Sequence, residues 1–306
     1  MVALPPRRLR RRCRLRGTNG APAGRGAPLT LASFALAAAL ASDGAPQAPP
    51  VFPAQAASVY LDVFATRDGE PVRGLTADDF EVLDGGRVVP IELVPTDAVP
   101  ISAILVLDTS LSVAGGRLDQ LRQACTAFVR ALAPRDEAML LTFSNAVHLR
   151  AAGEDRAALE RALDQTRAGG RTALFDAVFS GLLMAPSLPG RPALIVFSDG
   201  VDTVSWTGAA DSLALARRSS TLVYAVGVAS DLLQEVVNAT GGRALSESGK
   251  GLGNAFLRVL DDLRHRYLLR FDPGSPASGW RPLEVKLKHM HAELRYRPAY
   301  MREPNP

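Results

Sequence analysis

The sequence predicts an α/β fold in which a central, mostly parallel sheet is covered by helices on both faces, with a smaller β-rich module beside it. Three observations predict this fold. Continuous apolar runs such as ISAILVLD, ALIVFSDG and TLVYAVGV are typical of buried parallel strands. Stretches with helical periodicity separate these runs, which indicates successive βαβ units. The segments on either side of this region alternate apolar and polar residues with period two, as half-buried strands do.

The elements can be taken in order along the chain. The first flank contains SVYLDVFA, DFEVLD and RVVPIELV, with a turn at Asp84-Gly85-Gly86. A buried strand begins at Ile101, and AMLLTFS and the shorter AVHLR follow the first helix. The expected helices cover about residues 116–133, 155–167, 173–185, 208–219, 231–239 and 252–265. Period-two strands return in RYLLRF, PLEVKLK and AELRYRP. Because two-stranded pieces are marginal alone, we expect residues 58–95 and 266–300 to form one β-module.

Residues 1–41 are interpreted as a secretory signal peptide, followed by a Pro/Ala-rich linker over residues 42–57. A basic stretch precedes an apolar run that ends in Ala39-Leu40-Ala41, an A-x-A-like cleavage site. This run is shorter than the roughly 20 residues that a bilayer requires. A disordered Arg/Pro/Gly tail and an uncleaved membrane anchor are the alternatives. We expect an exported protein in the periplasm, at the cell surface or secreted, with membrane contact only if the leader stays attached.

The basic character of the chain belongs to its leader. The whole sequence has 35 Lys and Arg against 31 Asp and Glu, but eight of the arginines and none of the acids lie in residues 1–41. The remainder has 27 Lys and Arg against 31 Asp and Glu. This balance gives no reason to expect a nucleic-acid partner. Cys13 lies in the leader, so Cys125 is left alone in an apolar helical pattern and is expected to be a buried structural thiol.

Oxygen-bearing side chains follow the buried strands. LVLDTSLS supplies Asp108, Ser110 and Ser112 directly after the first strand, and IVFSDG supplies Asp199 after another. Thr172 lies in a Gly-rich turn that opens a helix. In open α/β sheets, ligands bind at the carboxyl ends of the strands, beside a topological switch point. These residues therefore form a candidate site, although Asp108 and Asp199 taken singly could also be helix N-caps or turn residues.

This set of side chains indicates one class of ion. Two carboxylates and three hydroxyls are hard oxygen ligands, which suit Mg²⁺, Mn²⁺ or Ca²⁺ and argue against zinc. Neutral hydroxyls leave such a cation incompletely neutralised, so it would still attract a carboxylate from outside.

The pattern Asp-x-Ser-x-Ser, then Thr, then Asp-Gly resembles the metal-ion-dependent adhesion site of the von Willebrand factor A (vWA) family. The resemblance covers residues 97–265 and implies a Rossmann-like vWA domain. It also implies that Asp108, Ser110, Ser112, Thr172 and Asp199 form the metal site, some of them through water, and that an exposed Asp or Glu of a partner protein completes the coordination.

The segments on either side of the vWA-like region make the resemblance more specific. They look like the flanks of bacterial exported "vWFA-related" proteins, in which both would pair into a small β-sandwich. This implies sandwich segments at residues 58–95 and 266–300, with a short tail at 301–306. The flank resemblance adds architecture more than function. We expect metal-dependent protein binding or adhesion, without catalysis and without a small-molecule substrate.

Several alternatives remain open. In one alternative, the protein is a structural or assembly module of the cell envelope, and the bound metal only stabilises its loops. A phosphatase- or nuclease-like metal enzyme is a more distant option. Asp176 is interpreted as a solvated or capping residue rather than an outer partner of the metal, and Asp202 and Thr203 as turn residues. His289 and His291 are interpreted as an exposed pair on one strand face rather than a zinc site.

The leader generates a first prediction. Export should remove residues 1–41, because small residues at Ala39 and Ala41 suit signal peptidase, so the mature chain should begin at Ser42. N-terminal sequencing of protein from an envelope fraction measures this. Finding only a cytosolic chain that still begins at Met1 would contradict the export.

Overall fold

The computed structural model describes residues 58–96, 99–198, 201–228 and 230–303. The chain divides into two units, Met1–Phe52 and Pro53–Pro306, and every described residue belongs to the second. The expected signal peptide, the linker and Asp199 lie outside the described residues. Within the described ranges, no helix has the length and apolar character that crossing a membrane requires.

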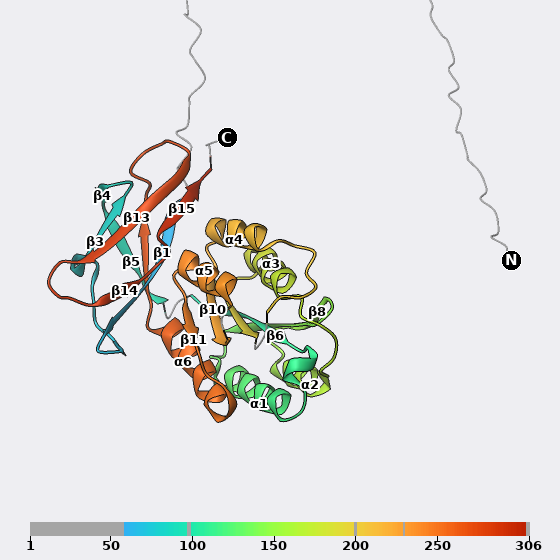
Figure 1. Ribbon diagram of the computed structural model, residues 1–306. Helices are drawn as coiled ribbons and strands as arrows, with labels where there is room; N and C mark the ends of the chain where they lie inside the picture. The colour runs from blue at the N-terminus through green and yellow to red at the C-terminus, as the bar shows by residue number, and fades with distance from the viewer. Residues whose placement is uncertain (1–57, 97–98, 199–200, 229, 304–306) are drawn as a thin grey trace, which may run out of the picture. The chain divides into compact units, whose positions relative to one another are not determined.

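A six-stranded sheet forms the centre of the α/β domain (Figure 1). Its strands lie in the order β11-β10-β9-β6-β7-β8, and all neighbours are parallel except β7 and β8. The chain moves outward from β6 to β7 and outward in the other direction from β9 to β10, so the order reverses between β6 and β9. This reversal is the topological switch point, where α/β sheets bind ligands. The strands are β6 (Ile101–Asp108), β7 (Glu137–Phe143), β8 (Val147–Gly153), β9 (Arg191–Ser198), β10 (Leu222–Gly227) and β11 (Arg243–Leu245).

Helices cover both faces of this sheet. Ala103, Leu105 and Leu107 of β6 pack into the core beneath α1, α2 and α6, whereas Ile104 and Val106 pack beneath α3, α4 and α5. Each helix lies within two residues of its predicted bounds. The α/β prediction is therefore confirmed. The helices are α1 (Gly116–Ala131), α2 (Arg156–Gln165), α3 (Leu174–Met184), α4 (Ala209–Arg218), α5 (Asp231–Thr240) and α6 (Leu252–Arg264).

One strand, β11, was not predicted from the sequence. It is three residues long and joins the sheet beside β10, and so short a segment shows no period. Gly242 permits its approach, because a Cβ atom there would lie 1.8 Å from the carbonyl oxygen of Val223.

The two flanks pair into two antiparallel sheets. One has the order β14-β1-β12-β5 with β2 beside β1, and the other has the order β15-β13-β3-β4. Both combine strands from the two flanks, since β1 pairs with β12 and β3 pairs with β13. Leu61, Val82, Leu269 and Val285 belong to one core shared by the two sheets, as the period-two patterns indicated. The strands are β1 (Val59–Arg67), β2 (Glu70–Pro71), β3 (Phe80–Asp84), β4 (Arg87–Val89), β5 (Ile91–Val94), β12 (Tyr267–Phe271), β13 (Gly279–Leu287), β14 (Glu293–Arg295) and β15 (Ala299–Arg302).

A buried carboxylate also links the two flanks. Asp84, at the end of β3, accepts hydrogen bonds from Arg281 Nε (2.6 Å), the backbone N–H of Gly274 (2.9 Å) and the hydroxyl of Tyr300 (3.3 Å). All three donors come from the second flank. Because a buried carboxylate without partners is costly, this cluster favours the paired arrangement of the flanks.

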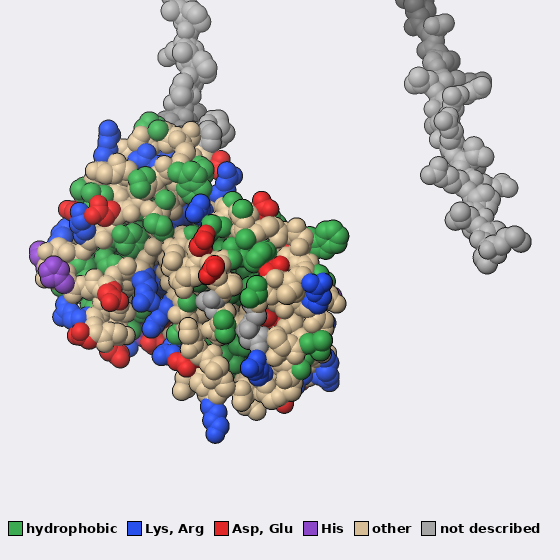
Figure 2. Space-filling view, in the orientation of Figure 1, with side chains coloured by type: hydrophobic (Ala, Val, Ile, Leu, Met, Phe, Trp, Pro, Cys, Tyr) green, Lys and Arg blue, Asp and Glu red, His purple; other side chains and the backbone are tan. Residues whose placement is uncertain are grey.

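Acidic and basic side chains are interspersed on the face that Figure 2 presents. Histidine side chains gather at one end of the sandwich in this view. His289 and His291 are exposed in the connection between β13 and β14, so their expected position on a strand face is wrong. Cys125 is buried in α1, as expected, and its burial raises the pKa of the thiol.

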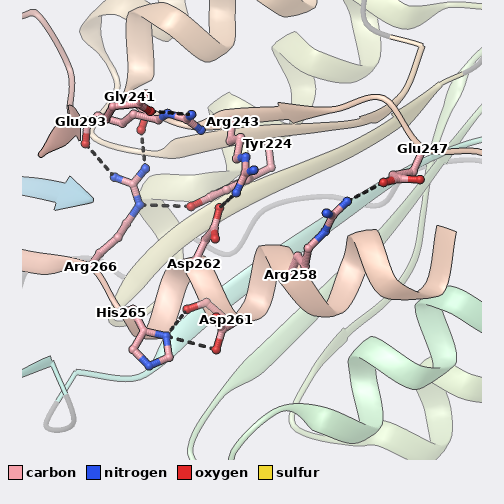
Figure 3. A network of polar contacts seen from close by, with 11 residues as sticks. Tyr224, Gly241, Arg243, Glu247, Arg258, Asp261, Asp262, His265, Arg266 and Glu293 are labelled. Carbon is pink, nitrogen blue, oxygen red and sulfur yellow. Dashed lines mark hydrogen bonds and ion pairs between the residues drawn. The ribbon is translucent and has the colours of Figure 1, made fainter. Parts of the chain in front are cut away.

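A buried arginine lies where α6 leads into β12 (Figure 3). The Arg266 guanidinium donates to the Tyr224 hydroxyl through Nε (3.1 Å) and also to the carbonyl oxygens of Gly241 and Asp62. It also lies over the rings of Phe64 and Tyr224, 5.6 and 5.9 Å from their centroids. Burial raises the pKa of Tyr224, so its hydroxyl stays neutral. One side chain thus bonds both the six-stranded sheet and the sandwich strand β1.

The shared sandwich core generates a second prediction. Deleting residues 273–306 removes β13, β14 and β15, so the β3–β4 hairpin loses the strand that it pairs with, and the shared core loses Leu283, Val285 and Tyr300. An isolated hairpin is marginal, and residues 80–89 should therefore lose their protection against hydrogen exchange. Helices α1 to α5 should keep theirs, because their cores contain no residue of the deleted segment. Unchanged protection of residues 58–95 in the truncated chain would contradict this account.

Candidate metal centre

The candidate site lies at the carboxyl edge of the six-stranded sheet, beside the switch point between β6 and β9. Asp108 is the last residue of β6, and Ser110 and Ser112 follow in the loop to α1. Thr109 holds the start of this loop against the neighbouring strand, because both its backbone N–H and its hydroxyl donate to the carbonyl oxygen of Phe143 in β7 (2.8 Å each). The position of the loop is therefore set by the sheet beneath it.

Asp108 is fully buried, and its carboxylate is oriented by two hydrogen bonds. Oδ1 accepts from the backbone N–H of Ser110 (2.8 Å), and Oδ2 accepts from the hydroxyl of Ser198 at the end of β9 (2.9 Å). The first bond turns the chain back over the strand end, as aspartate side chains often do in turns. The second spans the switch point and joins the two central strands through their side chains.

The two serine hydroxyls converge beside this carboxylate. Their Oγ atoms lie 2.8 Å apart. Ser110 is buried, and although it occupies the N-cap position of the short 3₁₀ helix Leu111–Val113, its hydroxyl makes no capping bond. Ser112 is exposed at the surface. The site thus has a buried acidic side and a solvent-facing hydroxyl side.

Backbone hydrogen bonds bring the Thr172 loop to the serine loop. The N–H of Gly169 donates to the carbonyl oxygen of Thr109 (2.8 Å), and the N–H of Leu111 donates to that of Gly170 (3.1 Å). Gly170 has a φ of 82°, a left-handed conformation that glycine adopts readily. Thr172 itself is buried three residues after Gly169. The structure therefore brings together the loops of four of the five predicted residues.

Asp199, the fifth predicted residue, lies outside the described residues. The residue before it, Ser198, is buried and bonded to Asp108. The sequence interpretation missed Ser198, although a polar residue at the end of the buried run ALIVFS was a signal for it.

Asp176, Asp202 and Thr203 hold the loop that follows β9. The Asp176 carboxylate accepts from the backbone N–H groups of Trp206 (3.0 and 3.1 Å) and Thr207 (2.7 Å). Asp202 accepts from the N–H of Phe175 in the first turn of α3 (3.2 Å).

Thr203 bonds Thr172 in both directions. Its hydroxyl accepts from the N–H of Thr172 (3.0 Å), and its own N–H donates to the carbonyl oxygen of Thr172 (2.8 Å). The interpretation of Asp202 and Thr203 as turn residues was therefore too narrow, because both fix the position of a distant loop.

The residues at this edge fit a hard divalent cation. Within the described ranges, no three His, Cys, Asp or Glu side chains are placed to hold a metal ion. A cation here would instead rely on the Ser110 and Ser112 hydroxyls, whose oxygens already lie together beside Asp108. Mg²⁺ and Ca²⁺ accept such neutral oxygen ligands together with carboxylates and water.

Comparison with known proteins agrees with this architecture. Residues 103–201 match the sequence model of the von Willebrand factor type A domain. The chain is similar to a von Willebrand factor type A structure from Catenulispora acidiphila, with 11% identity over 81% of this chain and 73% of that one and a TM-score of 0.50.

Two further structures are similar to this chain at lower scores. An aerotolerance-related membrane protein from Bacteroides fragilis has 16% identity over 53% of this chain and 98% of that one, with a TM-score of 0.45. Proximal thread matrix protein 1 from the mussel byssus, with a zinc-occupied metal-ion-dependent adhesion site motif, has 16% identity over 58% and 49% of the two chains and a TM-score of 0.48.

The search of curated proteins gave no match. The sequence-model match spans β6 to β9, the strands on either side of the switch point, and the six-stranded sheet with helices on both faces agrees with the similar structure from Catenulispora acidiphila. Residues 103–201 therefore identify a von Willebrand factor type A domain within this chain.

Proposed function

We propose that this chain is an exported, non-enzymatic binding or adhesion module that captures an acidic residue of a partner protein through a Mg²⁺-type ion. The observation that carries the proposal is the arrangement at the switch point. The buried Asp108 carboxylate lies beside two converging hydroxyls, one of which faces solvent. Such a site combines enough negative charge to attract a cation with an open side from which a partner could approach.

The proposed cation ligands are Asp108, Ser110, Ser112, Thr172 and Asp199, some of them acting through water, and Mn²⁺ or Ca²⁺ could replace Mg²⁺. When bound, the ion supplies a positive charge that attracts a carboxylate. The chain keeps that charge only partly neutralised, because three of the five ligands are neutral hydroxyls. The bonds from Ser110 and Ser198 to Asp108 fix its carboxylate in place before any ion binds.

Capture of a partner is favoured over a purely structural role for the ion. The loops around the site are already joined by backbone hydrogen bonds, from Gly169 to Thr109, from Leu111 to Gly170 and from Thr203 to Thr172. A metal is therefore not needed to hold these loops together. Catalysis by two metals would need a second set of ligands, whereas the five proposed residues form a single set.

Asp108→Asn tests the metal site. The amide keeps an oxygen that can accept from the Ser110 N–H but removes the charge that a cation requires. Affinity for Mg²⁺ should fall by more than about 100-fold, beyond the losses that outer-shell changes cause. The fold should lose only about 1 kcal/mol of stability, as expected for one altered hydrogen bond.

Isothermal titration with Mg²⁺ and thermal unfolding measure the two effects. Asp119→Asn is the matched control, because Asp119 is an exposed carboxylate on α1, and this variant should bind Mg²⁺ as the wild type does. Unchanged Mg²⁺ affinity in Asp108→Asn would show that the site is assigned wrongly.

Partner capture is tested separately from metal binding. The wild-type chain on a solid support should retain envelope proteins in Mg²⁺ and release them in EDTA, whereas Asp108→Asn should retain none of them. The structural alternative makes the opposite prediction: Mg²⁺ would raise the melting temperature, but the retained proteins would be the same in Mg²⁺ and in EDTA.

A further inference from the structure

Large apolar side chains are exposed around the candidate metal centre. Leu111, between the two serines, is 67% exposed, and Val228, directly after β10, is 61% exposed. Val201 and Trp206, in the connection between β9 and α4, are 73% and 96% exposed. Single exposed apolar residues are ordinary on protein surfaces. Four on loops at the same edge of one sheet indicate an interaction surface.

Backbone contacts place these side chains close to the site. The N–H of Leu111 bonds Gly170, and the N–H of Val228 donates to the carbonyl oxygen of Ser198 (3.0 Å), the residue whose hydroxyl bonds Asp108. Trp206 is three residues from Thr203, which bonds Thr172 in both directions. Three residues of extended chain reach at most about 11 Å. All of these loops therefore border the same centre.

Hydrogen bonds hold the backbone at Trp206, whereas its side chain is exposed. Its N–H and that of Thr207 donate to the Asp176 carboxylate from α3, and the Ser205 hydroxyl accepts from the Asp176 N–H (3.1 Å). The tryptophan ring itself is almost fully exposed. A rigid backbone reduces the entropy that a binding surface loses when a partner docks, and tryptophan is enriched among the residues that dominate binding energy.

The charges at this edge favour an acidic partner. Arg171, next to Thr172, is exposed and donates to the carbonyl oxygen of Thr203, while the Arg117 guanidinium donates to the carbonyl oxygen of Ser112 (3.3 Å). Of the carboxylates at this edge, Asp176 and Asp202 accept backbone N–H groups, and Asp108 belongs to the proposed cation site. Arginines on the rim of a site attract negatively charged partners and reject positively charged ones.

We propose that the partner segment is an acidic peptide in which an aromatic or large aliphatic residue lies within a few residues of the metal-binding carboxylate. This inference rests on the proposed function and adds the class of sequence that is captured. Trp206 and Leu111 contact the apolar residue. Arg171 and Arg117 favour a second acidic residue in the same segment.

The experiment uses a displayed library of short peptides with a fixed central glutamate and randomised neighbours. The library is selected on the immobilised full chain in Mg²⁺ and eluted with EDTA, and the affinity of an enriched peptide is then measured by fluorescence anisotropy. The variants are Trp206→Ser and, as the matched control, Trp280→Ser. Trp280 is also exposed, at 47%, but lies on the sandwich strand β13.

We expect the selected peptides to be enriched in aromatic or large aliphatic residues and in a second acid near the glutamate. Trp206→Ser should bind them at least about 10-fold more weakly, as for a residue that dominates an interface. Trp280→Ser should bind them like the wild type, and all three proteins should bind Mg²⁺ equally.

Two results would overturn the inference, and they differ in what they say about the proposed function. If Mg²⁺-dependent, glutamate-dependent peptides show no apolar preference and bind Trp206→Ser as tightly as wild type, the partner class is wrong while metal-dependent capture stands. If no glutamate peptide is retained in Mg²⁺ although the chain binds Mg²⁺, acid capture itself fails and the inference fails with it.

Discussion

The complete burial of strand β6 is the constraint on which the α/β domain depends. All of its residues are buried, and it pairs with β7 on one side and β9 on the other. Its alternate side chains enter the two cores on opposite faces of the sheet. Such a strand can end in a carboxylate only if that group is satisfied, because an unpaired buried charge is costly. Ser110 and Ser198 supply two of its hydrogen bonds, so the packing that buries β6 also positions the oxygen atoms proposed to hold a cation.

A second constraint lies where the chain passes between the sandwich and the α/β domain. The chain leaves the sandwich after β5, completes the six-stranded sheet, and returns from α6 directly into β12. Arg266 at this return is buried and bonds groups from both parts (Figure 3). The nearby Arg191 forms an ion pair with Asp62 of β1. Buried charged groups are tolerated when each finds partners, and here their partners come from segments far apart in the sequence. The paired flanks are therefore fixed to the domain that they enclose.

Most of the fold could be predicted from the sequence because its signals are local. The apolar run of β6 and the helical periods each span enough residues to be recognised, and the helix bounds agree within two residues. The three-residue strand β11 shows no period and was missed. At the site, the motif pattern proposed Asp108, Ser110, Ser112, Thr172 and Asp199 as cation ligands, and that assignment stays a prediction. The roles of Ser198, Asp176 and Thr203 were not predicted, because each acts through a contact with a loop that is distant in the chain. The rim of exposed apolar residues was missed for the same reason, since periodicity reports burial within elements and not the exposure of loop side chains.

The central claim is that a divalent cation binds at the carboxyl edge between β6 and β9. The most direct test is a crystal structure of the protein soaked with Mn²⁺, with an anomalous difference map recorded near the manganese edge. The account predicts one strong peak beside Asp108, Ser110 and Ser112, within roughly 2–2.5 Å of the protein oxygen atoms that bind the ion directly, a separation typical of hard cations and their oxygen ligands. A map with no peak at that edge, or with its only strong peak elsewhere, such as beside the exposed His289 and His291, would contradict the claim.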